Sequence, residues 1–137
     1  MNNDQISEVF AKGQTTGTAN NMFIDGDTIY SYGRHFPIAR WYKGVVLFNP
    51  DGYSNTTAKH KGKVLYALRG ETIVYLNDCD IRKIESQQDT NSREIESLKG
   101  KTERARSDHI KTYYMARIED LKNQNTLLSG LVEGVRE

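Results

Sequence analysis

Three histidines, His35, His60 and His109, carry the most versatile side chains for chemistry in this 137-residue sequence. An imidazole ring can ligate a metal ion, or it can accept a proton from a neighbouring hydroxyl group. No two of these histidines lie three or four residues apart, so the sequence predicts no metal site on a helix. A site in which His35 and His60 meet an aspartate in space is the alternative. We expect structural roles instead, with His35 half-buried on a strand and His60 on an amphipathic helix.

Hydroxyl groups at Ser31, Ser54, Thr56 and Thr57 lie near the histidines in the sequence and are candidate nucleophiles. A nucleophile needs a base within hydrogen-bond reach and a third group that orients the base. The sequence contains no G-x-S-x-G nucleophile elbow and no triad signature. Thr56 and Thr57 are better explained as caps of a helix that begins beside them. We therefore predict a non-enzymatic protein with no catalytic residue, metal or cofactor.

Aromatic and basic residues alternate in the same part of the chain. This pattern is typical of surfaces that stack nucleic-acid bases and contact phosphates. A small sheet whose aromatic residues fill the core and whose charges face water explains the pattern as well, and we favour it. The residues that would bind nucleic acid or a protein partner are Tyr32, Arg34, His35, Arg40, Trp41, Lys43, Lys59, His60 and Lys61.

Composition divides the chain into a compact domain at residues 1–78 and a helical arm at residues 79–137. Eleven of the thirteen aromatic residues and eight of the eleven glycines precede residue 79. After it the chain is rich in Glu, Lys, Arg, Gln and Asn, which favour a long helix. The fold class we predict is α+β, with a small, mainly antiparallel sheet, one packed helix and a long C-terminal arm that resembles a coiled coil.

The compact domain shows alternating strand and turn signals. We expect a short helix at residues 4–12 with Asp4 as its N-cap, and a polar loop at residues 14–21. Val64, Leu65 and Leu68 should line the buried face of the packed helix at residues 57–69. Strands are expected at residues 22–24, 28–32, 35–42, 45–48 and 71–76.

The arm has the 3.5-residue rhythm of a coiled coil, but in two registers that do not join. We expect a stutter, a kink or two separate helices near residues 100–112. The second half has the more apolar seam, which we expect to pair with another copy of the chain or with a partner. The seam residues are Tyr114, Ile118, Leu121, Asn125, Leu128 and Val132.

The middle of the arm is basic, with six Lys or Arg and two Asp or Glu between residues 99 and 117. A basic region ahead of a zipper-like segment is typical of a DNA-reading helix. Acidic residues interrupt this one, so a solvated helix face is the interpretation we favour.

The whole chain has a formal charge of +1, which provides no field to attract nucleic acid or an anionic membrane. The single cysteine, Cys79, excludes an intramolecular disulfide and any cysteine-rich zinc site. No run approaches the roughly 20 apolar residues of a membrane span, and the first residues lack the pattern of a signal peptide. We expect a soluble, cytoplasmic protein with no membrane partner.

Two segments carry a specific pattern, F-I-x-G-D-T-I-Y-S-Y-G-x-H-F-P-I-A at Phe23 to Ala39 and G-Y-S-x-T-T-x-K-H at Gly52 to His60. In these segments the chain resembles a family of short proteins from bacteriophages and other mobile elements. The resemblance covers about a third of the chain and brings no catalytic residues.

The resemblance implies action in a host cell. The function it implies is docking on a protein partner. The partner it implies is a component of host defence, such as a CRISPR effector, or of host nucleic-acid machinery, which the protein would inhibit. The alternative is a nucleic-acid-binding accessory or regulatory protein.

Overall fold

The computed structural model describes residues 1–52 and 54–136, with side chains described as far as residue 132. The chain forms two compact units, Met1–Asp80 and Ile81–Glu137. Each unit is described by itself below.

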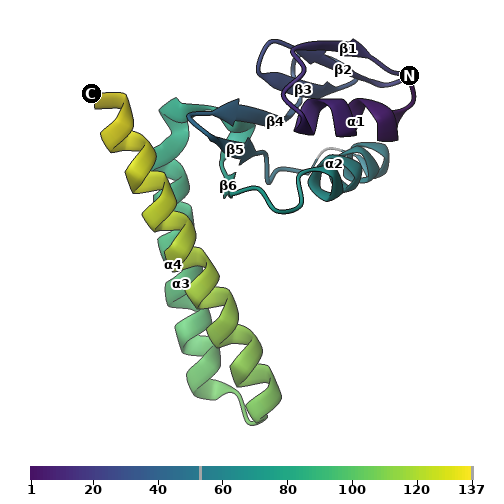
Figure 1. Cartoon of the computed structure of the whole chain (residues 1–137). Coiled ribbons are helices and arrows are strands. Elements are labelled where there is room, and N and C mark those ends of the chain that lie inside the picture. The colour runs from purple at the N-terminus through teal and green to yellow at the C-terminus, as the bar shows by residue number, and fades with distance from the viewer. Residues whose placement is uncertain (53, 137) are drawn as a thin grey trace. The chain divides into compact units, whose positions relative to one another are not determined.

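The first unit is built on a six-stranded sheet in the order β1-β2-β3-β4-β5-β6 (Figure 1). The first five strands are antiparallel neighbours, whereas β6 runs parallel to β5 because helix α2 connects them. The predicted α+β fold with a mainly antiparallel sheet is confirmed. The strands are β1 (Thr16–Thr18), β2 (Met22–Asp25), β3 (Thr28–Ser31), β4 (Pro37–Tyr42), β5 (Val45–Phe48) and β6 (Ile73–Tyr75).

Both helices of this unit begin at N-cap residues that differ from the predicted ones. Helix α1 (Asn3–Ala11) begins at Asn2, whose side chain accepts a hydrogen bond from the Gln5 backbone and whose own backbone N–H donates to the Gln5 side chain, which together form a capping box. Helix α2 (Asn55–Ala67) begins at Ser54, whose Oγ accepts a bond from the Thr57 backbone at 3.1 Å. Asp4, Thr56 and Thr57 therefore lie inside the helices and do not cap them.

Two further expectations about this unit are corrected. The polar segment at residues 14–21 contains strand β1, which pairs with β2 although it has no apolar side chain. Strand β4 begins only at Pro37, so His35 lies exposed in the turn before it and not half-buried on a strand. The imidazole of His35 folds over Gly33, where a Cβ atom would stand only 2.9 Å from Nδ1 of the ring.

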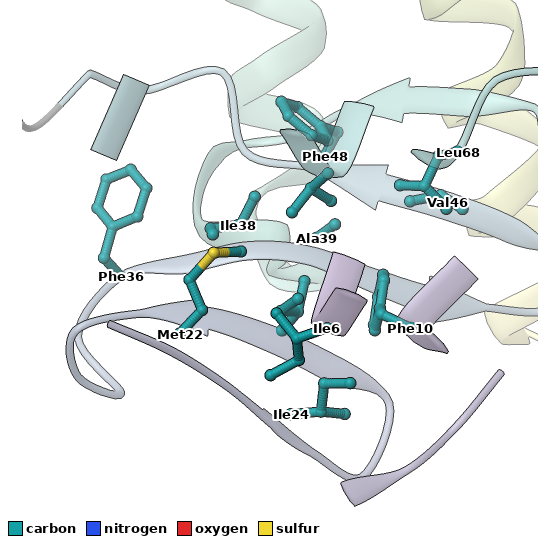
Figure 2. Packing of buried hydrophobic residues seen from close by; sticks show 12 residues of the cluster. Ile6, Phe10, Met22, Ile24, Phe36, Ile38, Ala39, Val46, Phe48 and Leu68 are labelled. Carbon is teal, nitrogen blue, oxygen red and sulfur yellow. The ribbon is translucent and has the colours of Figure 1, made fainter. Parts of the chain in front are cut away.

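The core lies between one face of the sheet and the two helices (Figure 2). Ile6 and Phe10 of α1, Val64 of α2 and Leu68 at the C-cap of α2 are buried there. Leu65, expected on the same face, is 37% exposed. The sheet contributes Met22, Ile24, Ile29, Ile38, Ala39, Val46 and Phe48. Since each large apolar side chain contributes about 1.5–3 kcal/mol when it is fully buried, this cluster is the main source of stability in the unit.

The second unit is a helical hairpin formed by α3 (Ile84–Arg104) and α4 (Asp108–Arg136) (Figure 1). Three residues, 105–107, connect the helices, so the arm is two separate helices that run antiparallel. Ile95 and Leu98 of α3 pack against Ile118 and Leu121 of α4. This contact decides among the three alternatives for residues 100–112.

Candidate functional site

The two segments of the resemblance meet at a chain of buried hydroxyl and imidazole groups. Ser31, the last residue of β3, lies with its Oγ 2.8 Å from His60 Nδ1 and 3.2 Å from Thr57 Oγ1, both on α2. Ser54 Oγ donates to Thr57 Oγ1 at 3.1 Å. We call Ser31, Ser54, Thr57 and His60 the hydroxyl relay. It ties the end of a central strand to the first turns of the helix.

The burial of His60 sets the charge of its ring. Nδ1 of His60 shares a hydrogen bond with the Ser31 hydroxyl, and which of the two groups donates depends on the tautomer of the ring. Burial, followed by the charge of Lys63, lowers the pKa of His60 below its ordinary value. The ring is therefore neutral at pH 7.

A serine bonded to a neutral imidazole is the arrangement of a nucleophile and its base. However, Ser31 is 1% exposed and His60 is 2% exposed. A substrate therefore does not reach the Ser31 hydroxyl in this conformation. The relay satisfies three buried polar groups, Ser31, Thr57 and His60, each of which would destabilise the fold if left without a partner, and it joins them to the exposed Ser54.

Tyr32 follows the relay and is the most unusual backbone position beside it. Its φ of 64° is in the left-handed region, which a bulky aromatic residue rarely adopts. The backbone N–H of Tyr32 donates to Asn21 at 2.7 Å, and its ring lies 5.6 Å from the ring of His60. The side chain is 51% exposed. The structure thus brings the predicted residues Tyr32 and His60 together, with the exposed ring of Tyr32 beside the buried ring of His60.

The predicted arginines lie on the sheet face opposite the core, and both are paired with aspartates. Arg34 forms an ion pair with Asp25 and lies over the stacked rings of Phe23 and Tyr30, 5.6 and 5.8 Å from their centres. Cross-strand pairing of Phe23 with Tyr30 in the β2–β3 hairpin places these rings side by side. This stacked pair is not among the residues predicted from the sequence, although the register of a two-residue hairpin turn provides the signal for it.

Arg40 is paired in the same way, through its Nε at 3.0 Å from Asp27. Burial raises the pKa of Asp27, but hydrogen bonds from Thr28 and Arg40 outweigh it and leave the pKa lowered. Arg40 and Lys43 also lie over the ring of Tyr42 at 5.4 and 5.6 Å. A phosphate group would have to displace these aspartates, so the geometry does not favour nucleic-acid binding on this face.

The remaining predicted residues lie elsewhere. Trp41 follows Arg40 on β4 and points to the opposite face of the sheet, as neighbours on a strand do. Trp41 packs on the core side against Phe10, and its Nε1 donates to the Phe10 carbonyl at 3.0 Å. Lys61 donates to the Asp51 carbonyl at 2.8 Å, and burial lowers its pKa. Lys59 lines an open groove of about 610 Å³ between α1 and α2. The nine predicted residues therefore do not form one surface.

The seam expected to pair with a second copy is covered within the chain. The Asn91 amide donates to Asn125 at 3.0 Å, and Gln87 donates to Asn91 at 3.1 Å. Gln88 bonds the Asn125 carbonyl at 3.1 Å and Ser129 at 2.9 Å. In this structure Ile118, Leu121 and Asn125 of the seam thus contact α3 of the same chain. Pairing of the six seam residues with another copy or with a partner stays a prediction; they are Tyr114, Ile118, Leu121, Asn125, Leu128 and Val132.

The connected end of the hairpin presents an apolar and basic surface. Ile110 is 45% and Tyr113 is 68% exposed, and the two lie three residues apart on one side of α4. The ring of Tyr113 meets that of Tyr114 at 5.9 Å. Lys101, Arg104 and Arg106 are exposed nearby along the chain, and no carboxylate of the described residues forms an ion pair with them. We call Ile110, Tyr113, Tyr114 and these three cations the hairpin tip.

Two kinds of site are not found in the described part of the chain. Its His, Cys, Asp and Glu side chains do not gather in a group of three that could hold a metal ion. None of its helices combines the length and the apolar character required to cross a bilayer.

No protein-family model matches the sequence, and comparison with curated proteins and with solved structures gives no significant match.

Proposed function

We propose that this chain is a non-enzymatic binding protein that docks on a protein partner through the hairpin tip. The observation that carries the proposal is the exposure of Ile110 and Tyr113 beside unpaired cations. Tyrosine and arginine are enriched among the residues that dominate binding energy at protein interfaces. A short helical hairpin presents such residues on a rigid support.

The charge of the tip indicates the chemistry of the partner. Residues 99–117 include six Lys or Arg and only two Asp or Glu, whereas the whole chain has a formal charge of only +1. An acidic surface with an apolar centre complements this tip. A second copy docked tip to tip would bring like charges together, so the partner is a different protein.

The described chemistry of the first unit supports binding over catalysis. The candidate nucleophile and base are closed inside the hydroxyl relay, and the arginines of the outer sheet face are paired with aspartates. The resemblance to mobile-element proteins extends the proposal to a partner in host defence or in host nucleic-acid machinery.

The proposal is tested by capture from host lysate with variants of the tip. Ile110→Asp with Tyr113→Ser removes the apolar centre at exposed positions, so the fold should be retained. Met115→Ser is the matched control, because Met115 is 60% exposed on another side of α4. We expect a protein that binds the parent chain and the control, that is lost with the double variant, and that is recovered equally after nuclease treatment.

Equal recovery by the double variant would contradict docking through the tip. Loss of the captured protein after nuclease treatment, with binding that weakens steeply as salt is raised, would instead favour the nucleic-acid-binding alternative.

A further inference from the structure

Strand β1 lies at one end of the six-stranded sheet, where it pairs with β2 (Figure 1). The Thr15 carbonyl accepts a hydrogen bond from the residue after β2 at 2.9 Å, and the Ala19 N–H donates to the first residue of β2 at 2.8 Å. Alternate residues of an antiparallel strand point their backbone groups to the same side. The N–H and C=O groups of Thr16 and Thr18 therefore point away from β2, to the open edge of the sheet.

This edge lacks the residues that usually protect a sheet from a further strand. Such protection commonly comes from charged side chains, above all Lys, and from Pro. Residues 14–21 contain neither a charged residue nor a proline, and Thr16 and Thr18 are both exposed. One side chain covers the edge instead. Gln14 Nε2 donates to the Thr16 carbonyl at 2.6 Å and so occupies an acceptor that a further strand would use.

The edge is complementary to itself about Gly17, because Thr-Gly-Thr reads the same in both directions. In an antiparallel pair centred on Gly17, Thr16 of one copy lies opposite Thr18 of the other. Both residues point their N–H and C=O groups outward, so they form a hydrogen-bonded pair, and their side chains form a favourable Thr–Thr pair. A register shifted by one residue would oppose Thr16 with Gly17, whose backbone groups face β2. The centred register is therefore the one that satisfies the edge.

Gly17 provides an independent observation. Its φ lies outside the left-handed region, and an added Cβ would make only ordinary contacts, 3.5 Å from Ile24 Cδ1 and 3.6 Å from Ile6 Cγ1. The fold of a single copy thus does not require glycine at this position. In the centred pair the two Gly17 residues form the non-hydrogen-bonded pair, in which Cα atoms approach to about 4.5 Å. A glycine within a strand is typical of a place where another backbone comes close.

We propose that two copies of the chain pair through β1, antiparallel about Gly17, and join their six-stranded sheets into one. The Gln14 side chain of each copy must first leave the Thr16 carbonyl, so it weakens the association. Because residues 14–21 carry no charge, the strength of this contact should not change with ionic strength. The proposal rests on the strand register and not on docking through the hairpin tip.

The first test is the mass of the full chain, measured by light scattering over a series of concentrations. The parent should be a 15.6 kDa monomer when dilute and form a dimer as the concentration rises. Gln14→Ala should raise the dimerisation constant roughly tenfold, because neither copy then has to break its Gln14 hydrogen bond. Thr56→Ala, at an exposed position of α2, is the control and should leave the constant unchanged.

A second variant blocks the edge. Thr18→Pro, made in the Gln14→Ala chain, should abolish the dimer. Since the Thr18 N–H points away from β2, proline removes a donor only from the open edge and leaves β1 paired with β2. Thr18→Val keeps the N–H and is the matched control, which should stay dimeric. Trp41 fluorescence in urea shows whether both variants keep the fold.

A cross-link locates the contact on the chain. Chains carrying Thr16→Cys and chains carrying Thr18→Cys are mixed and oxidised. The proposed register places the two positions opposite each other with Cα atoms about 5.5 Å apart, which a disulfide can span. Thr16→Cys mixed with Thr56→Cys is the control and should cross-link far less.

Two results would overturn the proposal. One is a Gln14→Ala chain with the same mass as the parent at every concentration. The other is cross-linking between positions 16 and 18 no greater than that of the control. If Thr18→Pro instead released a captured host protein without changing the mass of the chain, the open edge would belong to an extended segment of that protein, and pairing of two copies would likewise be wrong.

Discussion

The two units of the chain bury polar groups in different places. In the first unit the hydroxyl relay lies at the margin of a broad apolar core that two helices and a sheet build together. In the hairpin the amides of Gln87, Asn91 and Asn125 occupy the seam itself, beside a cluster of only a few apolar side chains. Apolar packing therefore dominates the first unit, whereas paired amides set the alignment of the two helices of the hairpin.

This difference separates stability from specificity. Apolar side chains can pack in several alternative arrangements with similar stability. Hydrogen-bonded amides are satisfied in only one register and one direction of the two helices. The seam of the hairpin thus specifies how α3 and α4 align and is only moderately stable. The first unit is the part of the chain that should unfold last.

The largest effect is expected for Phe10→Ala, which should destabilise the first unit by about 3–5 kcal/mol because it leaves a cavity in the core. Trp41, the single tryptophan, contacts Phe10 and so reports this unit by fluorescence. Helix signal by circular dichroism reports mainly α3 and α4, which span 21 and 29 residues. In urea the fluorescence transition should shift, and most of the helix signal should not.

Phe10→Leu is the matched control for that variant, since it keeps most of the volume and should cost less. If fluorescence and helix signal moved together by the same amount, the two units would unfold as one, and the comparison drawn above would fail.

A smaller effect is expected for Asn125→Ala, which leaves the Asn91 amide without its partner and should destabilise the hairpin by about 1–3 kcal/mol. Replacing both with leucine should be neutral or stabilising, because no buried amide is then left unpaired. Urea unfolding followed by circular dichroism measures both. A double variant less stable than the single one would show that the amides are net stabilising and not only specifying.

The cap of α2 gives a still smaller effect. Ser54→Ala should lower the stability of the first unit by about 1 kcal/mol, because Ser54 satisfies the backbone of Thr57. Thr56→Ala, at the neighbouring exposed position, should stay within about 0.5 kcal/mol of the parent. Trp41 fluorescence in urea distinguishes them. Equal losses at the two positions would argue against Ser54 as the cap.

The smallest effect is a pH dependence that comes from His60. Its pKa is lower in the folded chain than in the unfolded chain, so the unfolded state binds more protons as the pH falls below about 6.5. The contribution of neutral His60 is fully present above that pH and is lost as the pH falls toward the lowered pKa. His60→Gln should be less stable than the parent at pH 7.5, and the difference should narrow at pH 5. A constant difference would show that His60 titrates alike in both states.

Local signals predicted much of the first unit. Strand 45–48 was expected and is found as Val45–Phe48, preceded by the turn at Lys43 and Gly44, where both residues have positive φ as a tight hairpin requires. Strand β1 could not be predicted, because Thr-Gly-Thr has no apolar side chain and becomes a strand only through its neighbour β2. Tertiary pairing decided that segment.

The candidate sites show a different limit. Ser31 and His60 are 29 residues apart, and only the packing of α2 against the sheet brings them within 2.8 Å. The arm was ambiguous because residues 105–107 contain neither Gly nor Pro, although the two registers on either side of them do not join. The spacing of apolar residues identified the seam. It does not show that the chain turns back at residues 105–107, because none of these three residues strongly favours a turn.

Cys79 has a practical consequence for every cysteine-based measurement on this protein. Its thiol is 2% exposed, points to the carbonyls of Ile38 and Leu47, and burial raises its pKa to about 12. A thiol reagent therefore reacts with it only when the first unit opens. Labels placed elsewhere will be selective in the native chain without removing Cys79, and the rate at which Cys79 itself is modified is a built-in clock for the opening of that unit.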